Sequence, residues 1–307
     1  MNTRPSDGPR GGDGTENVVR TQTFDVNGPV ELDLDITAGT VEVHLDRGAG
    51  RSKDGDGGED DDPADTTVAV EVRSAPFTSP AWAQSAAGVL SWVGEMFGGQ
   101  VGGPFSNTPA DAVREVRLEQ VGERIVVRGP KTPPPVSAAL TVTVHAPAGS
   151  HLRARTRLAS VVVRGMCGRA DISTGPGNVT LDRVVDSTTV RTSSGEVDIA
   201  TSNGPVTVNG GSGDVRFGEV TAAVWVRTAG GEIVIDDAAA GSVEAFSGSG
   251  DIRIGIRKGV TAEIDLSSGG GSVHSALDVS DTPPEESAAL TVRARSGAGD
   301  VLVTGAR

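Results

Sequence analysis

The sequence predicts an all-β protein, a β-solenoid (β-helix) with two short strands in each turn of about 18–19 residues and one inserted helix. Three observations support this fold class. Glycine-anchored units recur about every 9 residues between Gly177 and Gly250. In each unit, the second and fourth residues after the anchor are apolar, and the residue between them is mostly polar or charged. Glycine contributes 43 of the 307 residues, which favours many short strands joined by tight turns.

The repeat is regular enough to predict which side chains face inward. Its anchors are 9 residues apart, with one interval of 10 between Gly231 and Gly241, and Asp186 and Ala222 stand where the other units have glycine. Because side chains alternate along a strand, the two apolar positions of a unit share one face, and stacked units bury a continuous core. The predicted core pairs are Val179/Leu181, Val197/Ile199, Val206/Val208, Val215/Phe217, Val224/Val226, Ile233/Ile235, Val243/Ala245 and Ile252/Ile254. An antiparallel β-sandwich is the alternative, although its turns are seldom spaced so evenly.

Three parts follow one another along the chain. Residues 1–21 are polar and are predicted to be a disordered leader. Residues 22–130 are predicted to be an N-terminal β segment, in which "VELDLDITAGTVEVHL" forms two strands joined by a turn around Gly39. The acidic run 48–65 interrupts this segment as a loop, because its low-complexity composition cannot bury a core. Residues 131–307 are predicted to form the repetitive solenoid.

An aromatic insertion at residues 77–105 separates two of the predicted strands. It holds five of the nine aromatic residues, and its serine–proline start and Gly-Gly stop predict the single helix of the protein. Strands resume at 113–129. The helix either caps an open end of the solenoid or presents Trp82, Trp92 and Phe97 to a partner or a membrane.

Composition limits the classes of function. The formal net charge of −14 argues against nucleic acid or an anionic membrane as the main partner, since both need a positive protein surface. Cys167 is the only cysteine, which excludes an internal disulfide and an all-cysteine metal site. The N-terminus has no apolar signal-peptide core, and no stretch approaches the roughly 20 apolar residues of a membrane helix. We therefore expect a cytoplasmic protein.

Few residue patterns point to a metal or a cofactor. Three Gly-Ser-Gly-Asp or Gly-Ala-Gly-Asp sequences, ending at Asp214, Asp251 and Asp300, are similar to calcium-binding nonapeptide repeats but lack one residue before the aspartate. We expect these aspartates to form turns by accepting hydrogen bonds from backbone amides. The four histidines fit no metal-ligand spacing. The sequence therefore predicts no metal site and no cofactor.

The sequence also carries little sign of catalysis. Some β-helices cleave carbohydrates with acids on one outer face, but Asp198, Glu244 and Glu263 are predicted to point outward from different strands. No HExxH sequence, nucleophile elbow or Walker loop occurs. We predict that the protein is not an enzyme.

Trp225 is the best candidate for an outer binding surface within the repeat. It lies between two inward-facing valines, so its indole should face outward, near Thr207 and Glu244 of the adjacent turns. Exposed tryptophan is typical of binding surfaces, although the inserted helix could instead cover it. Trp225 and the three aromatic residues of the insertion form the predicted interaction surface.

The repeats resemble the DUF4097 family. The resemblance is carried by "LTVTVHAPAGSHLRARTRLASVVVRG", "DISTGPGNVTLDRV", "VRTSSGEVDI", "NGGSGDVRF", "VRTAGGEIVI" and "FSGSGDIRI", and it covers about residues 138–304 and, more weakly, 22–128. It implies a bacterial β-solenoid of unknown biochemical role. The family is also labelled "putative adhesin", a role that requires export. Ser160 stands where the family pattern has glycine in a turn.

The most direct functional prediction is a non-catalytic β-solenoid scaffold that interacts with a protein or ligand. A protein partner or self-association is expected, with no nucleic acid and with membrane contact only through residues 77–105. Two alternatives remain open from the sequence. One is a structural protein that stacks end to end through its open strand edges, and the other is a carbohydrate-active β-helix enzyme.

Overall fold

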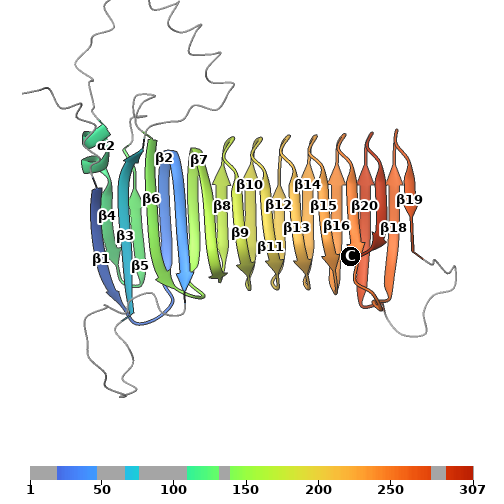
Figure 1. The fold of residues 1–307 in the computed structure, drawn as a ribbon, viewed down its shortest axis with the longest axis horizontal. Coiled ribbons are helices and arrows are strands. Elements are labelled where there is room, and N and C mark those ends of the chain that lie inside the picture. Colours follow the sequence, from blue (N-terminus) through green and yellow to red (C-terminus); the bar gives the residue numbers. More distant parts are fainter. Residues whose placement is uncertain (1–18, 47–65, 76–108, 131–138, 278–287, 307) are drawn as a thin grey trace, which may run out of the picture.

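The computed structural model describes residues 19–46, 66–75, 109–130, 139–277 and 288–306. Within these ranges the chain is nearly all β-strand, wound into one elongated stack (Figure 1). The predicted acidic loop and the aromatic insertion lie outside the described residues, as does the predicted leader up to its last three residues.

The strands and the helix follow one another in this order: β1 (Val19–Val26), β2 (Glu31–Asp46), β3 (Thr66–Ala75), α2 (Pro109–Glu115), β4 (Arg117–Val121), β5 (Arg124–Arg128), β6 (Ala139–Pro147), β7 (His151–Cys167), β8 (Ala170–Thr174), β9 (Val179–Val184), β10 (Thr188–Thr192), β11 (Val197–Ser202), β12 (Val206–Asn209), β13 (Val215–Val220), β14 (Val224–Thr228), β15 (Ile233–Ala238), β16 (Gly241–Ser247), β17 (Ile252–Ile256), β18 (Ala262–Ser268), β19 (Val273–Ser275), β20 (Leu290–Ser296) and β21 (Val301–Gly305).

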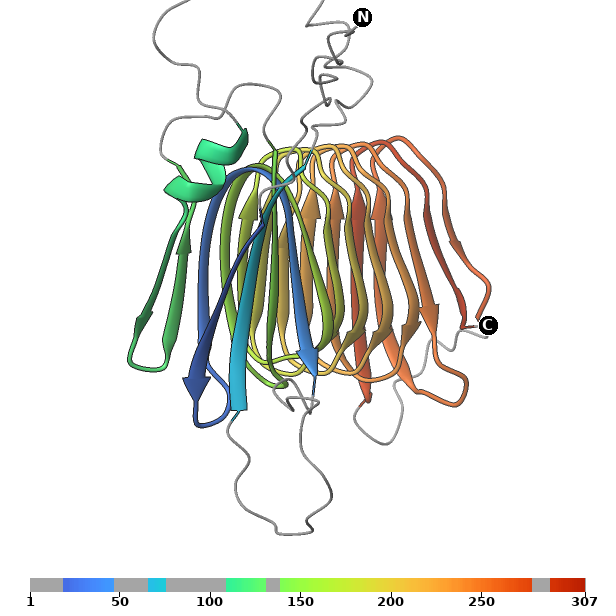
Figure 2. The same cartoon turned by 60° about the vertical axis from the view of Figure 1, so that its left-hand side comes forward.

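Alternate strands of the repeat pair with each other, so the chain forms two facing parallel sheets (Figure 2). The first sheet runs through β8, β10, β12, β14 and β16, and the second runs through β9, β11, β13, β15 and β17. Val206 pairs with Thr188 of the turn before it and with Val224 of the turn after it. This register confirms a solenoid with two strands per turn. The parallel pairing also rules out the antiparallel sandwich for the repeats.

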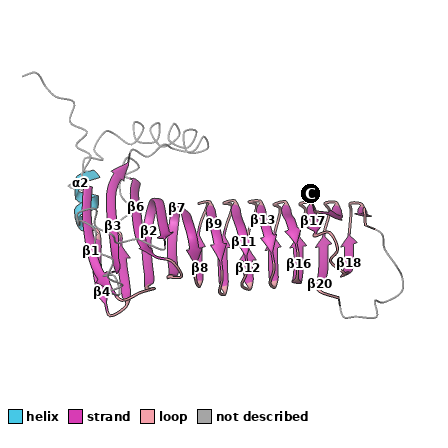
Figure 3. Cartoon of the chain, turned by 60° about the horizontal axis from the view of Figure 1, so that its bottom comes forward, coloured by secondary structure: helices cyan, strands magenta, loops and turns pink. Residues whose placement is uncertain are grey.

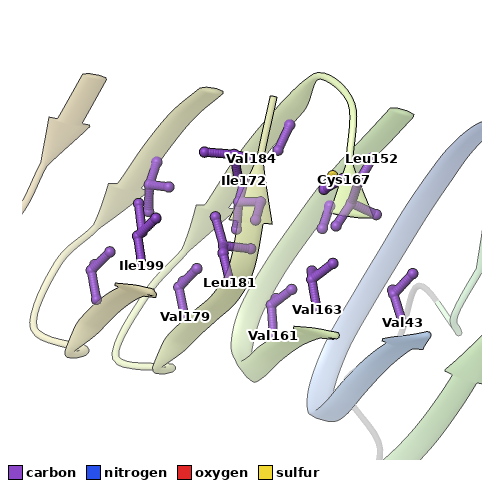
Figure 4. Packing of buried hydrophobic residues seen from close by; sticks show 14 of the residues in the cluster. Val43, Leu152, Val161, Val163, Cys167, Ile172, Val179, Leu181, Val184 and Ile199 are labelled. Carbon is purple, nitrogen blue, oxygen red and sulfur yellow. The ribbon is translucent and has the colours of Figure 1, made fainter. Parts of the chain in front are cut away.

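The core is a thin layer of aliphatic side chains between the two sheets. Every predicted core pair faces inward, and none of these residues is more than 2% exposed. Figure 4 shows the arrangement: Val161 and Val163 lie beside Val179 and Leu181 of the next turn. Full burial of a valine or isoleucine contributes about 1.5–3 kcal/mol, so stability accumulates turn by turn.

Buried hydroxyl groups hold one corner of the stack. The Oγ1 atom of Thr192 accepts a hydrogen bond from the amide of Gly195 at 3.0 Å and donates to the carbonyl of Gly175, one turn back, at 2.9 Å. Thr228, further along the stack, makes the same two bonds with Gly231 and Gly211. Ser247, Ser296 and Ser268 repeat the pattern. Each hydroxyl therefore makes one hydrogen bond within its own turn and one to the neighbouring turn.

The anchor glycines are required by the stacking of the corners. A Cβ atom added at Gly231 would overlap the carbonyl oxygen and carbon of Gly213, one turn away. A Cβ added at the preceding Gly230 would meet nothing nearer than the Ser249 Oγ at 3.5 Å, an ordinary contact. Of these two positions, only the anchor Gly231 lies directly against the backbone of the neighbouring turn, so only this position has no room for a side chain.

The two glycines give a matched test of this explanation. We expect Gly231→Ala to lower the free energy of unfolding by about 1–3 kcal/mol or more, because backbone atoms cannot rotate out of the way. We expect Gly230→Ala to change it by less than about 1 kcal/mol. Urea denaturation of both variants makes the comparison. Equal losses of stability would contradict the stacking explanation.

The N-terminal end of the stack is built differently. β2 and β7 each continue around a corner from the first sheet into the second, and they pair with each other along their length. The predicted turn around Gly39 is this corner of β2, where φ is 130°. β5 and β6 pair with the two halves of β2, and β4, β3 and β1 then add antiparallel strands outside them.

The helix α2 corrects the strand predicted from residue 113, since Pro109–Glu115 is helical. The helix predicted within 77–105 lies outside the described residues, so α2 is a helix that the sequence did not predict. Ala112, Val113 and Val116 are buried where α2 packs against β1, β3 and β6. A short helix is favoured here because it begins with proline, carries an acid in its first turn and an arginine in its last.

The C-terminal strands join the stack out of chain order. β20 lies between β16 and β18, and β21 lies between β17 and β19 (Figure 1). The last turn in space is therefore β18–β19, although β20 and β21 come later in the chain. Figure 3 shows this end of the stack opposite α2.

Candidate functional site

On the outer face of the second sheet, Arg216 and Arg257 are held in ion pairs. Arg216 donates from Nε and from one terminal nitrogen to the Asp236 carboxylate at 3.0 and 2.7 Å. Arg257 binds the carboxylates of Asp237 and Glu219, and the hydrogen bonds to Asp237 and then to Glu219 raise the pKa of Arg257. The hydrogen bond to Asp236 likewise raises the pKa of Arg216. These arginines are already bound within the protein.

The outer face of the first sheet carries Trp225, as predicted. Trp225 pairs with Thr207 on one side and with Glu244 on the other, which confirms the neighbours that the repeat implied. The indole is half-buried rather than fully exposed. Its ring centroid lies 6.4 Å from that of Phe246, at an interplanar angle of 49°. The two rings form a tilted aromatic pair.

Beside this aromatic pair the surface is hollowed. The hollow, which we call the Trp225 groove, has a volume of about 1010 Å³. It is lined by Asn209, Gly210, Trp225, Arg227, Thr228, Ala229, Phe246, Ser247, Gly248, Arg295, Ser296 and Gly297. Large side chains at the ends of the strands thus face small residues at the corners.

The stacking of the corners explains why the groove residues located there have small side chains or none. A Cβ atom at Gly248 would overlap the carbonyl oxygen of Ala229, and one at Gly297 would overlap that of Gly248. Glycine is therefore required by the fold at Gly248 and Gly297. A large residue on the opposite side of the groove is not required by the fold, because Thr207 occupies the position of Trp225 in the preceding turn of the same sheet.

Arginines surround the groove, and they differ in their partners. Arg295 donates to the Asp265 carboxylate at 3.2 Å, and Arg293 lies 3.3 Å from Asp265 and 3.9 Å from Glu244. The Arg227 side chain makes no hydrogen bond or ion pair with any described residue. A planar guanidinium without a partner, next to two aromatic rings, is a suitable binding group for an anion.

The three aspartates of the Gly-x-Gly-Asp sequences accept hydrogen bonds from backbone amides, as predicted, but these amides belong to the neighbouring turn of the stack and not to a local turn. The Oδ1 atom of Asp214 accepts the amide of Glu232 at 2.8 Å, and that of Asp251 accepts the amide of Asp300 at 2.9 Å. Asp300 accepts both the amide and the hydroxyl of Ser272, and these bonds lower the pKa of Asp300. Their carboxylates are thus used to join one turn to the next.

The remaining candidate acids and histidines do not form a catalytic or metal site within the described ranges. Asp198 lies on β11 of the second sheet, whereas Glu244 and Glu263 lie on β16 and β18 of the first. No group of three or more His, Cys, Asp or Glu side chains there could hold a metal ion. His44 and His145 do come together, with stacked rings 4.7 Å apart, which their sequence spacing did not indicate.

Cys167 is buried in the core between the sheets (Figure 4). Burial, and secondarily the negative charge of Asp186, raise the pKa of its thiol to about 12. At neutral pH the folded protein therefore holds no thiolate at this position, and Cys167 has no role as a nucleophile.

The raised pKa of Cys167 predicts both its reactivity and a pH effect. The folded protein should not react with a thiol reagent at about pH 8, and the unfolded protein should react fully. Because the unfolded thiol ionises first, Cys167 should stabilise the fold less as pH rises above about 9 toward 12. Urea titrations of the wild type and Cys167→Ala over this range isolate the effect. Rapid labelling of the folded protein would contradict the prediction.

The sequence indicated only part of the Trp225 groove. Asn209, Arg227 and Phe246 occupy equivalent positions in successive turns, so the repeat itself could have revealed this column. Arg295 could not be found that way, because β20 enters the stack out of chain order. Trp82, Trp92 and Phe97 lie outside the described residues.

Fold and site together define a β-solenoid with an aromatic-lined hollow on one outer face. None of the helices in the described part of the chain is long and apolar enough to span a membrane. Residues 166–304 match the family model described as "Toastrack DUF4097". This match confirms the resemblance for residues 166–304. No curated protein matches the chain.

Several solved structures are similar to this chain at low sequence identity. A "putative adhesin" from Bacteroides fragilis NCTC 9343 is 12% identical, with a TM-score of 0.49 over 93% of this chain and 97% of that one. A "putative lipid binding protein" from Parabacteroides distasonis ATCC 8503 is 11% identical, with a TM-score of 0.44 over 96% of each chain. A "putative adhesin" from Parabacteroides merdae ATCC 43184 is 9% identical, with a TM-score of 0.40 over 96% of this chain and 98% of that one. None of these similarities transfers a function to this chain.

Proposed function

We propose that this protein is a non-catalytic scaffold that binds a protein or ligand partner through the outer face of its first sheet. The observation that carries the proposal is the Trp225 groove, where a half-buried aromatic pair adjoins an arginine with no described partner. Tryptophan and arginine are among the residues most enriched at the centres of binding surfaces. Trp82, Trp92 and Phe97 of the insertion are proposed to extend the same interaction role.

The fold supports a scaffold because the core and the outer faces are separate. Inward positions are used for packing, and corner positions are used for stacking. Only the outward positions are left to vary, and among them Trp225 replaces the threonine of the preceding turn. A large apolar ring at an outward position contributes little to the core, so a binding role accounts for it better.

The proposal is tested by removing the ring while keeping the repeat. Trp225→Thr restores the residue found at Thr207 and should leave the unfolding midpoint within a few degrees. We expect the wild type to bind a component of a panel of immobilised glycans, peptides and lipids, and Trp225→Thr to lose at least about tenfold in affinity. Val234→Thr, at an outward position of the second sheet, is the matched control and should bind as the wild type does.

An opposite result would identify an enzyme. Turnover of a polysaccharide or ester by the purified protein, abolished by Asp198→Asn or Glu244→Gln, would contradict the non-catalytic scaffold.

Self-association through the C-terminal end is a second candidate function. On β18 the inward residues Ala262, Ile264 and Leu266 are only partly buried, and Val273 of β19 is 47% exposed. Among the described residues, β18 pairs only with β20, so its other edge is free. Free parallel edges over an incompletely covered core favour pairing with another copy.

Self-association has its own matched pair of variants on β18. We expect the wild-type mass from light scattering to rise with concentration toward that of two copies, and Ile264→Lys to remain a monomer. Ser267→Lys, on the outer face of the same strand, should associate as the wild type does. A wild-type protein that stays monomeric at high concentration would exclude this candidate.

A further inference from the structure

The Trp225 groove extends over four neighbouring strands of the first sheet. Its lining lies on or directly after β12, β14, β16 and β20. Asn209 pairs with Arg227, Arg227 with Phe246, and Phe246 with Arg295. Neighbouring strands lie about 4.8 Å apart, so the lining covers about 14 Å across the strands. This width accommodates a ligand that contacts several turns at once.

The lining combines apolar rings with hydrogen-bonding groups. Trp225 and Phe246 offer flat apolar surfaces, which match the C–H face of a sugar ring in size and shape. Arg227 offers a planar set of donors for a carboxylate, sulfate or phosphate oxygen pair. Asn209 adds an amide that can bond a hydroxyl group.

Arginine recurs at every second turn along the same outer column. The column contains, in spatial order, Arg155, Ser173, Arg191, Asn209, Arg227, Phe246 and Arg295. Two turns correspond to about 10 Å, so the guanidinium groups are offered at that interval. Of these, Arg191 is bound to Asp171 and Arg295 to Asp265 at its end of the column. Arg155 and Arg227 are the arginines of this column that no described side chain binds, and they lie four strands, or about 19 Å, apart.

The position of the groove disfavours an extended peptide. β14 and β16 use their backbone amides and carbonyls within the sheet, so the outer face offers side chains alone. A peptide crossing the strands could not pair its own backbone there. A carbohydrate has no such backbone and is bound through ring faces, hydroxyls and charged groups.

The acidic side chains nearest the groove are paired with arginines. Asp265 accepts hydrogen bonds from Arg293 and Arg295, and the Glu244 carboxylate lies 3.9 Å from Arg293. Their negative charges are therefore offset locally, and Arg227 is left to attract an anionic group.

We propose that the Trp225 groove binds an acidic carbohydrate chain, with sugar rings on Trp225 and Phe246 and an anionic group on Arg227. This inference rests on the proposed scaffold function and names the class of its ligand.

Isothermal titration calorimetry of the wild-type full chain measures binding with Trp82, Trp92 and Trp225 all in place. The probes are an oligogalacturonate, a chondroitin sulfate oligosaccharide and a polysialate. The methyl ester of the same oligogalacturonate is the uncharged control. We expect saturable binding of at least one acidic probe, weakened by added salt and absent with the ester.

Two arginine variants locate the anionic contact. Arg227→Gln should weaken binding by roughly tenfold, as expected for losing one charged hydrogen-bonded pair. Arg216→Gln, on the outer face of the second sheet, should stay within about twofold of the parent. Thermal unfolding of each variant shows whether it is folded.

The outcomes separate this inference from the scaffold function. No response to any of the three acidic probes, an equal response to the methyl ester, or no effect of Arg227→Gln would each overturn the carbohydrate inference. If a peptide or lipid of the panel still bound in a Trp225-dependent way, the scaffold function would remain supported even though the carbohydrate inference had failed. If Trp225→Thr changed no binding at all, the scaffold function would fall as well.

Discussion

Hydrogen bonding between equivalent residues of successive turns is the interaction on which the rest of the structure depends. Val197 pairs with Val179 of the preceding turn and with Val215 of the following one, and this register places every inward pair over the one before it. Parallel pairing stacks like on like, so valine lies over valine and glycine over glycine. The turn from Val224 to Val243 is one residue longer, yet it keeps the same register because the extra residue is taken up at the corner.

The same constraint assigns a separate role to each position. Inward side chains are nearly all apolar, and the second-sheet anchors lie so close to the neighbouring backbone that only glycine fits. Corner hydroxyls and aspartates must reach the next turn. Only the outward positions are free of these requirements. Arg216 and Arg257 of the second sheet, and Arg191 and Arg295 of the first, are bound by acids of the chain. Arg227 lies beside an aromatic pair, without a partner among the described residues. A rigid stack with one adaptable face is a suitable design for binding.

The sequence predicted those features that follow from local repetition. The inward pairs, the aspartates that accept backbone amides and the outward direction of Trp225 all follow from strict alternation within a repeating turn. What it could not predict depends on contacts between distant segments. His44 meets His145 only because β2 pairs with β6, and α2 is buried only because β1 and β3 lie beneath it. Arg295 reaches the groove through the same kind of long-range pairing.

The out-of-order position of β20 and β21 has a consequence for local unfolding. β18 and β19 reach the rest of the stack through β20 and β21, so their hydrogen bonds cannot outlast those of the strands inserted beside them. In hydrogen-exchange terms, the four strands should open as one cooperative unit, while β16 and β17 remain protected by β14 and β15. β20 also supplies Arg295 to the Trp225 groove, so ligand binding in that groove and the folding of the four C-terminal strands are thermodynamically linked. A bound ligand would therefore slow the amide hydrogen exchange of β18 and β19 without contacting β19.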